Sequence, residues 1–188
     1  MIAFFGWGSL VWDPGALSIH RKWHSDGPYV RAEFLRQSSN GRLTLVLEQT
    51  ADPVRSLWAT FDGLDLAQAR ESLRSREGIP ASNTNKSVGS WSRGDPNPDC
   101  ILEIGPWAAS RGIESVVWTA LPSKFNEQVG VGPSIDQAVA YLSGLNGPTR
   151  DLAEQYVRQA PQQVDTTYRR KIEAALGWSY AQHHRVGA

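Results

Sequence analysis

The first third of the chain alternates apolar and polar positions in the way that is typical of β-strands. This pattern predicts strands over residues 2–5, 29–38, 43–48 and 56–61. The second and third of these flank Ser39-Asn40-Gly41-Arg42, which contains the Asn-Gly dipeptide favoured in tight hairpin turns. We therefore expect these two strands to be antiparallel neighbours in one sheet.

A helical period begins at Leu66, with Ala69 and Leu73 following at the spacing of one helix face. The helix is predicted to end at Gly78, because glycine is favoured just beyond a helix C-terminus. The next segment, residues 78–99, lacks periodicity and is rich in Gly, Pro, Asn and Asp. It is predicted to be a long loop, which in a small domain is either functional or a solvated connection.

The remainder of the chain changes from a strand pattern to a helix pattern. Short strands are predicted over residues 101–104 and 115–121, and helices over residues 134–147, 149–159 and 165–176. Ser134 and Gln137 are spaced as a capping box at the start of the first of these helices. Strands followed by helices indicate the α+β class. We expect a single domain over residues 1–188, with a core over about 1–130 and a C-terminal helical segment over about 131–188.

Composition excludes several classes of function. With 19 basic and 19 acidic residues among 188, the chain lacks the basic surface on which nucleic-acid binding depends. The single cysteine, Cys100, excludes an internal disulfide and any cysteine-cluster metal site, and it indicates a reducing, cytoplasmic compartment. No apolar run approaches the roughly 20 residues of a membrane span. No nucleic acid, membrane, metal or cofactor is therefore predicted, and the oligomeric state is left open.

Glu77 conflicts with two local rules at the end of the predicted helix. At 100° per residue it lies within about 20° of the apolar stripe through Leu66 and Leu73, which directs its carboxylate towards the interior. It also occupies the last turn, where the helix dipole disfavours negative charge. Such conflicts tend to fall at functional sites. The alternative is that Glu77 turns outward and pairs with Arg70 or Arg74 on the surface.

A second candidate site, Gly6-Trp7-Gly8-Ser9-Leu10, directly follows the first predicted strand. Its glycines allow a tight turn, and its backbone N–H groups can bind an anion such as a carboxylate. The segment matches neither the phosphate-binding P-loop nor the dinucleotide-binding fingerprint, and Ser9 does not occupy a nucleophile elbow. A simple turn at the end of a strand is the alternative.

Together these segments resemble the γ-glutamylcyclotransferase-like family. Phe5-Gly6-Trp7-Gly8-Ser9-Leu10-Val11-Trp12 is similar to the Phe-Gly-Tyr-Gly-Ser-Leu-Ile-Trp opening of its ChaC branch, which acts on glutathione. Leu57-Trp58-Ala59-Thr60-Phe61, the following helix and Arg76-Glu77-Gly78 resemble the strand, helix and catalytic glutamate of that family. Trp7 stands where the family has tyrosine. The fold that this resemblance implies is a small mixed β-barrel with packed helices.

The resemblance also implies a reaction. In this family the free α-amine of a γ-glutamyl compound attacks its own side-chain carbonyl, which forms 5-oxoproline and expels an amine or a peptide. It implies that Glu77 is the catalytic base and that Gly6, Trp7, Gly8, Ser9 and Leu10 bind the substrate, with backbone N–H groups of Gly8, Ser9 and Leu10 on the carboxylate or the developing oxyanion. The expected partner is a small γ-glutamyl molecule.

Two alternatives to the cyclotransferase hypothesis share its fold. One is a non-catalytic small-molecule binding protein, and the other is an acyltransferase or hydrolase acting on a different γ-linked amide. The predicted loop over residues 78–99 follows Glu77 directly and carries polar residues such as Asn85 and Lys86. We expect this loop to be a lid that closes over the substrate and selects its leaving group.

Overall fold

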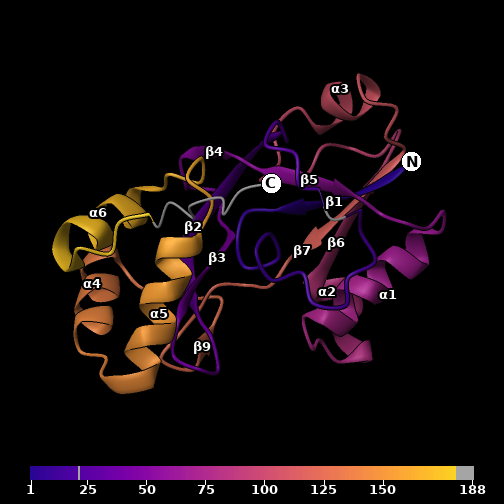
Figure 1. The fold of residues 1–188 in the computed structure, drawn as a ribbon. Coiled ribbons are helices and arrows are strands. Elements are labelled where there is room, and N and C mark those ends of the chain that lie inside the picture. Colours follow the sequence, from indigo (N-terminus) through magenta and orange to yellow (C-terminus); the bar gives the residue numbers. More distant parts are fainter. Residues whose placement is uncertain (21, 181–188) are drawn as a thin grey trace, which may run out of the picture.

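The structure is a computed structural model that describes residues 1–20 and 22–180 (Figure 1). The end of the predicted C-terminal segment, residues 181–188, lies outside the described residues. In the described ranges the strands form two mixed sheets rather than one closed barrel. One has the strand order β5-β1-β7-β6, and the other has the order β3-β2-β8-β9 with β4 paired to β2.

The first sheet is built around β1 (Ile2–Gly6), whose five residues are all buried. It pairs antiparallel with β5 (Leu57–Thr60) and parallel with β7 (Ser115–Thr119). Because β1 and β7 are parallel, their C-terminal ends meet at one edge of the sheet. The segment after Gly6 and the residues at the end of β7 therefore lie close together.

Helix α1 (Leu66–Arg76) packs against this sheet, with Ala69 and Leu73 buried in a cluster that also contains Phe4 and Phe61. The Asp65 side chain caps the helix by accepting from the Ala67 amide, and the helix ends at Glu77, directly before Gly78, as predicted.

The second sheet contains the predicted hairpin. β2 (Tyr29–Gln37) pairs antiparallel with β3 (Leu43–Leu47), as the Asn-Gly turn indicated. Gly41 has a φ of 80°, a conformation that favours glycine. β2 also pairs with β4 (Pro53–Arg55), which was not predicted, and with β8 (Lys124–Phe125), which continues into β9 (Gln128–Val129).

Three C-terminal helices lie beside the second sheet (Figure 1): α4 (Ile135–Ser143), α5 (Gly147–Gln159) and α6 (Thr167–Leu176). The predicted capping box of Ser134 and Gln137 begins α4. The other two starts were predicted at residues 149 and 165, three residues and one residue away from the observed caps, Asn146 and Thr166. The buried Glu33 carboxylate of β2 accepts from the Thr166 hydroxyl at 2.5 Å, which attaches this segment to the sheet.

The strand predicted over residues 101–104 is wrong. Ile101 makes only an isolated bridge with Val30, and Ile104 begins helix α3 (Ile104–Ala109). Pro106 lies in the first turn of this helix, where its missing N–H would have no intrahelical acceptor in any case. Proline therefore favours a helix start at this position rather than a strand.

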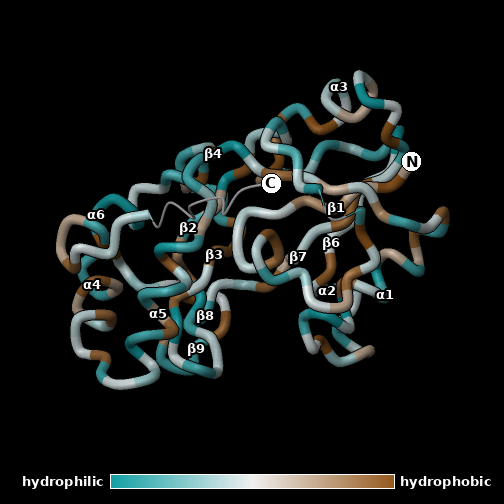
Figure 2. The backbone as a smooth tube through the Cα atoms, in the orientation of Figure 1, coloured by the Kyte–Doolittle hydropathy of each residue, from teal (hydrophilic) through white to brown (hydrophobic). Residues whose placement is uncertain are grey.

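The long loop predicted over residues 78–99 is also wrong in its central part. This segment contains a turn of 3₁₀-helix (Ala81–Asn83), α2 (Thr84–Ser87) and β6 (Val88–Ser92), which pairs with β7 at the edge of the first sheet. Figure 2 shows that much of α5 is hydrophilic, whereas β7 carries the buried valines Val116 and Val117. Within the described part of the chain, no helix is both long and apolar enough to cross a membrane.

Candidate active site

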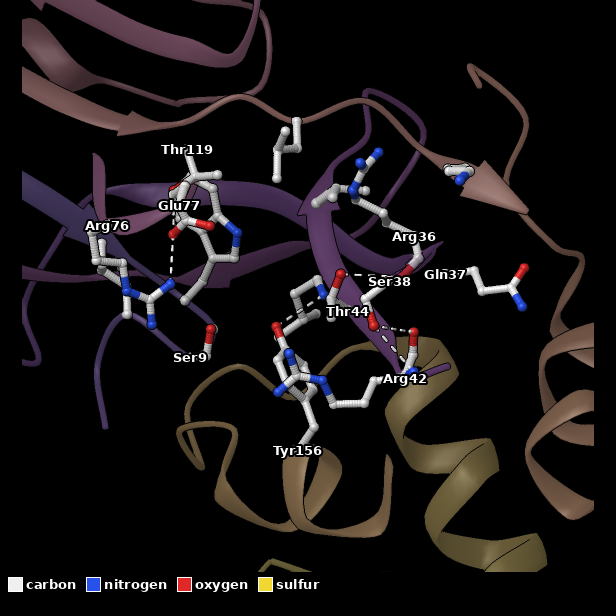
Figure 3. A pocket seen from close by; sticks show the side chains of 18 of the residues that line it. Ser9, Arg36, Gln37, Ser38, Arg42, Thr44, Arg76, Glu77, Thr119 and Tyr156 are labelled. Atoms are coloured by element: carbon white, nitrogen blue, oxygen red, sulfur yellow. Dashed lines mark hydrogen bonds and ion pairs between the residues drawn. The ribbon is translucent and has the colours of Figure 1, made fainter. Parts of the chain in front are cut away.

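A cavity of about 440 Å³ opens between the two sheets. Every site residue predicted from the sequence, Gly6–Leu10 and Glu77, lines this cavity. Figure 3 shows that its labelled side chains fall into two groups. The carboxylate end comprises Gly6–Leu10, Arg76, Glu77 and Thr119, from the ends of β1, α1 and β7. The hairpin end comprises 36–39, Arg42 and Lys124, from β2, the hairpin turn and β8.

Glu77 faces this cavity, and its side chain is only 15% exposed. Its Oε1 atom pairs with Arg76 Nη1 at 2.8 Å and accepts from Thr119 Oγ1 at 3.3 Å. The alternative of an outward ion pair does not occur, because Arg74 pairs with Glu71 instead and Arg70 donates to Asn85. Two elements thus hold the carboxylate near the C-terminal ends of β1 and β7: α1 through Arg76, and β7 through Thr119.

The segment from Gly6 to Leu10 lines the same cavity and forms a tight turn. The Gly8 and Ser9 carbonyls accept from the Val11 and Asp13 amides, at 3.0 and 2.8 Å. The Trp7 and Leu10 side chains are buried in the two hydrophobic clusters, so Leu10 offers only backbone polar groups to a ligand. The structure therefore brings all five predicted binding residues to the carboxylate end.

Tyr156 of α5 was missed by sequence reasoning. It is buried beside the loop, and a Cβ atom placed on Gly8 would lie 2.6 Å from its hydroxyl, which explains why this position is a glycine. The hydroxyl accepts from the Leu45 amide at 3.2 Å. Burial raises the pKa of Tyr156 to about 12, although the Leu45 and Ser9 amides oppose that shift. The phenol is therefore neutral at physiological pH and has a proton to donate.

The cations of the hairpin end were also missed. Arg36 donates to the Pro122 carbonyl at 2.8 Å, and Arg42 donates from Nε to Asn40 Oδ1 at 3.0 Å while its guanidinium lies 5.5 Å from the centre of the Tyr156 ring. Arginines flanking a polar turn are typical of a solvated surface, and nothing in the local pattern distinguishes these two. Only the folded chain places them in a cavity.

The segment over residues 78–99, expected to be a lid, contributes no residue to the lining of this cavity in the described structure. Asn85 is used in a hydrogen bond to Arg70, and β6 is fixed in the first sheet. In the described ranges, no group of three or more His, Cys, Asp or Glu residues is arranged to hold a metal ion. The described residues that line the cavity offer a carboxylate, a neutral phenol, side-chain hydroxyls, backbone amides, three arginines and a lysine.

No family model and no curated protein matches the sequence. Among solved structures, the fold is similar to a γ-glutamyl cyclotransferase specific to glutathione from yeast, crystallised with selenomethionine. The two chains are 15% identical, the match covers 97% of this chain and 99% of that chain, and the TM-score is 0.50. The predicted fold class is confirmed: the chain has an α+β fold of the γ-glutamylcyclotransferase-like type.

Proposed function

We propose that this protein is a γ-glutamyl cyclotransferase-like enzyme that releases 5-oxoproline from a γ-glutamyl amine or peptide in the cytoplasm. The observation that carries the proposal is that Glu77 and the Gly6–Leu10 turn face one cavity, although they are far apart in the sequence. A carboxylate opposite a turn rich in backbone N–H groups suits an acyl transfer, which needs both a proton acceptor and a site for developing negative charge.

The reaction begins with the α-amine of the substrate. Such an amine has a pKa of about 8 and is largely protonated near neutrality, so it needs a base before it can attack. The Glu77 carboxylate takes this proton, and Thr119 and Arg76 fix its orientation through the contacts at 3.3 and 2.8 Å. The neutral amine nitrogen then forms a bond to the γ-carbonyl carbon and closes a five-membered ring.

The tetrahedral intermediate carries its negative charge on the former carbonyl oxygen. The Tyr156 hydroxyl, which is protonated at physiological pH, and the backbone amides of the turn donate to this oxygen. The bond between the γ-carbon and the leaving nitrogen then breaks, and Glu77 returns the proton to that nitrogen. The ring nitrogen still carries a second proton, which the Glu77 carboxylate takes up and passes to the released amine. The products are 5-oxoproline and a free amine, and the carboxylate is regenerated.

Most of the acceleration comes from conformation, because nucleophile and electrophile belong to one molecule. Holding the folded-back conformer replaces the search for a second reactant, which is worth up to about 7–11 kcal/mol in well-oriented systems. The chemistry requires neither a metal nor a cofactor.

The test is to incubate the protein with a panel of γ-glutamyl amines, γ-glutamyl dipeptides and glutathione, and to measure 5-oxoproline by mass spectrometry. We expect release from at least one compound and loss of release in the Glu77→Gln protein. Binding of these compounds without any release would favour a binding protein on the same fold. Release of free glutamate instead of 5-oxoproline would favour a hydrolase.

A further inference from the structure

A buried carboxylate of the second sheet lies at the start of helix α6. Glu33 of β2 is only 5% exposed. Its oxygens accept from three donors: the Thr166 hydroxyl at 2.5 Å, the Phe34 amide at 2.9 Å and the Tyr168 amide at 3.1 Å. Removing a carboxylate from water is costly unless its oxygens find such donors. Glu33 therefore stabilises the fold through these specific contacts rather than through packing alone.

The contacts of Glu33 complete the N-terminus of α6. Tyr168 and Arg169 lie in the first turn of this helix, so their amides have no acceptor within it. The Tyr168 amide donates to Glu33, and the Arg169 amide donates to the Thr166 hydroxyl at 3.1 Å. A carboxylate at this position also interacts favourably with the helix dipole. Glu33 thus fixes the start of α6 on β2.

The Arg169 side chain extends this connection to α5. It is only 3% exposed, and its guanidinium donates to the Pro161 carbonyl at 2.8 Å, to the Val164 carbonyl at 3.1 Å and to the Val157 carbonyl at 3.5 Å. The Val157 carbonyl lies in the last turn of α5, and the residue four positions further on is Pro161, which has no N–H. Arg169 therefore supplies a donor that the helix itself lacks.

The same turn of α5 carries the phenol of the cavity, because Tyr156 directly precedes Val157. The Tyr156 hydroxyl accepts from the Leu45 amide of β3, which lies at the edge of the second sheet. The Phe34 ring of β2 also contacts the Tyr156 ring, with ring centres 6.1 Å apart. The second sheet thus meets Tyr156 directly, and it holds the helix that carries Tyr156 through the contacts that begin at Glu33.

A second connection between α5 and α6 lies at the surface. Arg158 of α5 is 35% exposed and donates to the Gly177 and Ser179 carbonyls, each at 3.2 Å, at the far end of α6. Exposed contacts of this kind contribute little, because their partners are hydrated when the contact is absent. The buried contacts of Glu33, Thr166 and Arg169 are therefore expected to determine where the end of α5 lies on the sheet.

We propose that Glu33 is a positioning residue for the reaction: through Thr166 and Arg169 it holds the last turns of α5, and with them the Tyr156 hydroxyl, at the cavity. This inference rests on the proposed function, in which Tyr156 donates to the developing oxyanion. A donor displaced by about 1 Å loses much of its effect on the rate. Glu33 does not line the cavity itself, so it acts through Tyr156.

The kinetic test is a double-mutant cycle with Tyr156→Phe. Glu33→Gln keeps the size of the side chain but replaces one acceptor oxygen by an NH₂ group among donors. For the γ-glutamyl compound that reacts fastest, we expect kcat to fall by about 10-fold and KM to stay within about twofold. In the Tyr156→Phe protein, Glu33→Gln should change kcat by less than about twofold, because the donor that Glu33 positions is absent. Equal losses of kcat in both proteins would indicate a general structural role and overturn the proposal.

Hydrogen exchange at the Leu45 amide measures the placement of Tyr156 without any turnover, because the Tyr156 hydroxyl is its acceptor. Glu33→Gln should lower the protection of this amide by about 10-fold relative to the amides of β7, which lies between β1 and β6 and reports global opening. If no compound yields 5-oxoproline but this loss occurs, the proposed function fails and the placement of Tyr156 by Glu33 stands. Unchanged relative protection at Leu45 would overturn the proposal even in an active enzyme.

Thr166 provides a second pair of variants, which keeps the test decisive if Glu33→Gln does not fold. Thr166→Val removes the hydroxyl that joins Glu33 to the Arg169 amide and should lower kcat and Leu45 protection as Glu33→Gln does. Thr166→Ser keeps a hydroxyl at the cap and should stay within about twofold of wild type in both measurements. The matched control is Arg158→Gln, which removes only the surface connection. Equal losses in Arg158→Gln and Thr166→Val would assign the effect to general docking of the two helices and overturn the role of Glu33.

Discussion

The carboxylate end and the hairpin end of the cavity differ in charge and in origin. The first presents Glu77 beside backbone amides, at the meeting point of two parallel strands in the buried centre of the first sheet. The second presents Arg36, Arg42 and Lys124 from a hairpin and a two-residue strand of the second sheet. The carboxylate end, which suits proton transfer, thus lies on the more deeply buried sheet. The hairpin end, which suits ligand recognition, lies on a hairpin.

This difference implies that reaction and selectivity are separable. Substitutions in the hairpin alter charge at the far side of the cavity without touching the contacts that Thr119 and Arg76 make with Glu77. Tyr156 is the exception, since it contacts the loop at Gly8, the strand at Leu45 and the guanidinium of Arg42. Changes at the carboxylate end should therefore affect kcat, whereas changes at the hairpin end should affect the choice of leaving group.

The largest effect is expected from Glu77→Gln. Glutamine keeps the shape and hydrogen-bonding capacity of the side chain but cannot accept the proton of the α-amine, so turnover should fall by about 10²- to 10⁴-fold while substrate binding persists. The measurement is 5-oxoproline release under single-turnover conditions. Glu71→Gln on the same helix is the matched control, because Glu71 is exposed and pairs with Arg74. Near-full activity of a folded Glu77→Gln protein would falsify the base assignment.

The next largest effect is expected from Tyr156→Phe, which removes a donor from the developing oxyanion. We expect kcat to fall by about 10²-fold with a small change in KM, since the contact strengthens only in the transition state. Because the pKa of Tyr156 is raised to about 12, its phenol stays protonated from neutral to moderately alkaline pH. The ratio of wild-type to variant rates should therefore be constant between about pH 7 and pH 10.

Tyr168→Phe is the control for this variant, because the Tyr168 hydroxyl donates to the Pro133 carbonyl outside the cavity. Equal losses of activity in the two proteins would assign the effect of Tyr156→Phe to packing. A change in KM with unchanged kcat would place the Tyr156 hydroxyl on the ground-state substrate instead of the oxyanion.

The carboxylate end could be anticipated from the sequence because its signals are local. Glu77 is a carboxylate on the apolar face at the C-terminal end of its own helix, and Gly6–Leu10 is a glycine-rich turn directly after a buried strand. Each of these features can be recognised from neighbouring residues alone. The hairpin end could not. Tyr156 lies on the buried face of α5, where a tyrosine is typical of a core, and it meets Leu45 across 111 positions. No local pattern predicts such a contact.

The fold follows the same division between local and distant causes. The ends of α1 and the capping box of α4 depend on neighbouring residues and were predicted. β6 was not, because Val88-Gly89-Ser90-Trp91-Ser92 lacks an apolar alternation and becomes a strand by pairing with β7. A Cβ atom on Gly89 would lie 2.3 Å from Trp118 of that strand, so the glycine that obscures the strand pattern is required by the pairing.

Gly8→Ala tests whether the two ends depend on one contact between the loop and Tyr156. The new methyl group would lie 2.6 Å from the Tyr156 hydroxyl, and the buried ring has little room to move. We expect a loss of about 1–3 kcal/mol in the free energy of unfolding from overpacking, together with a fall of about 10- to 100-fold in kcat/KM. Gly105→Ala is the control, because its nearest contacts lie at 3.8 and 3.9 Å. Unchanged activity of the Gly8→Ala protein would show that activity does not depend on the contact between the loop and Tyr156.

The smallest effect is expected from Thr119→Val, which keeps the shape of the side chain and removes its hydrogen bond to Glu77. The contact is long at 3.3 Å, and Arg76 still holds the same carboxylate oxygen at 2.8 Å. A hydrogen bond to a carboxylate contributes about 1.5–3 kcal/mol at good geometry, and this long one contributes less, so kcat should fall by about 2- to 10-fold, with the same preference among leaving groups. The measurement is kcat/KM for γ-glutamyl-glycine and γ-glutamyl-glycinamide. If Thr119→Val changed the ratio between these two compounds, the carboxylate end would also contribute to leaving-group selection, and the two ends would not be separable.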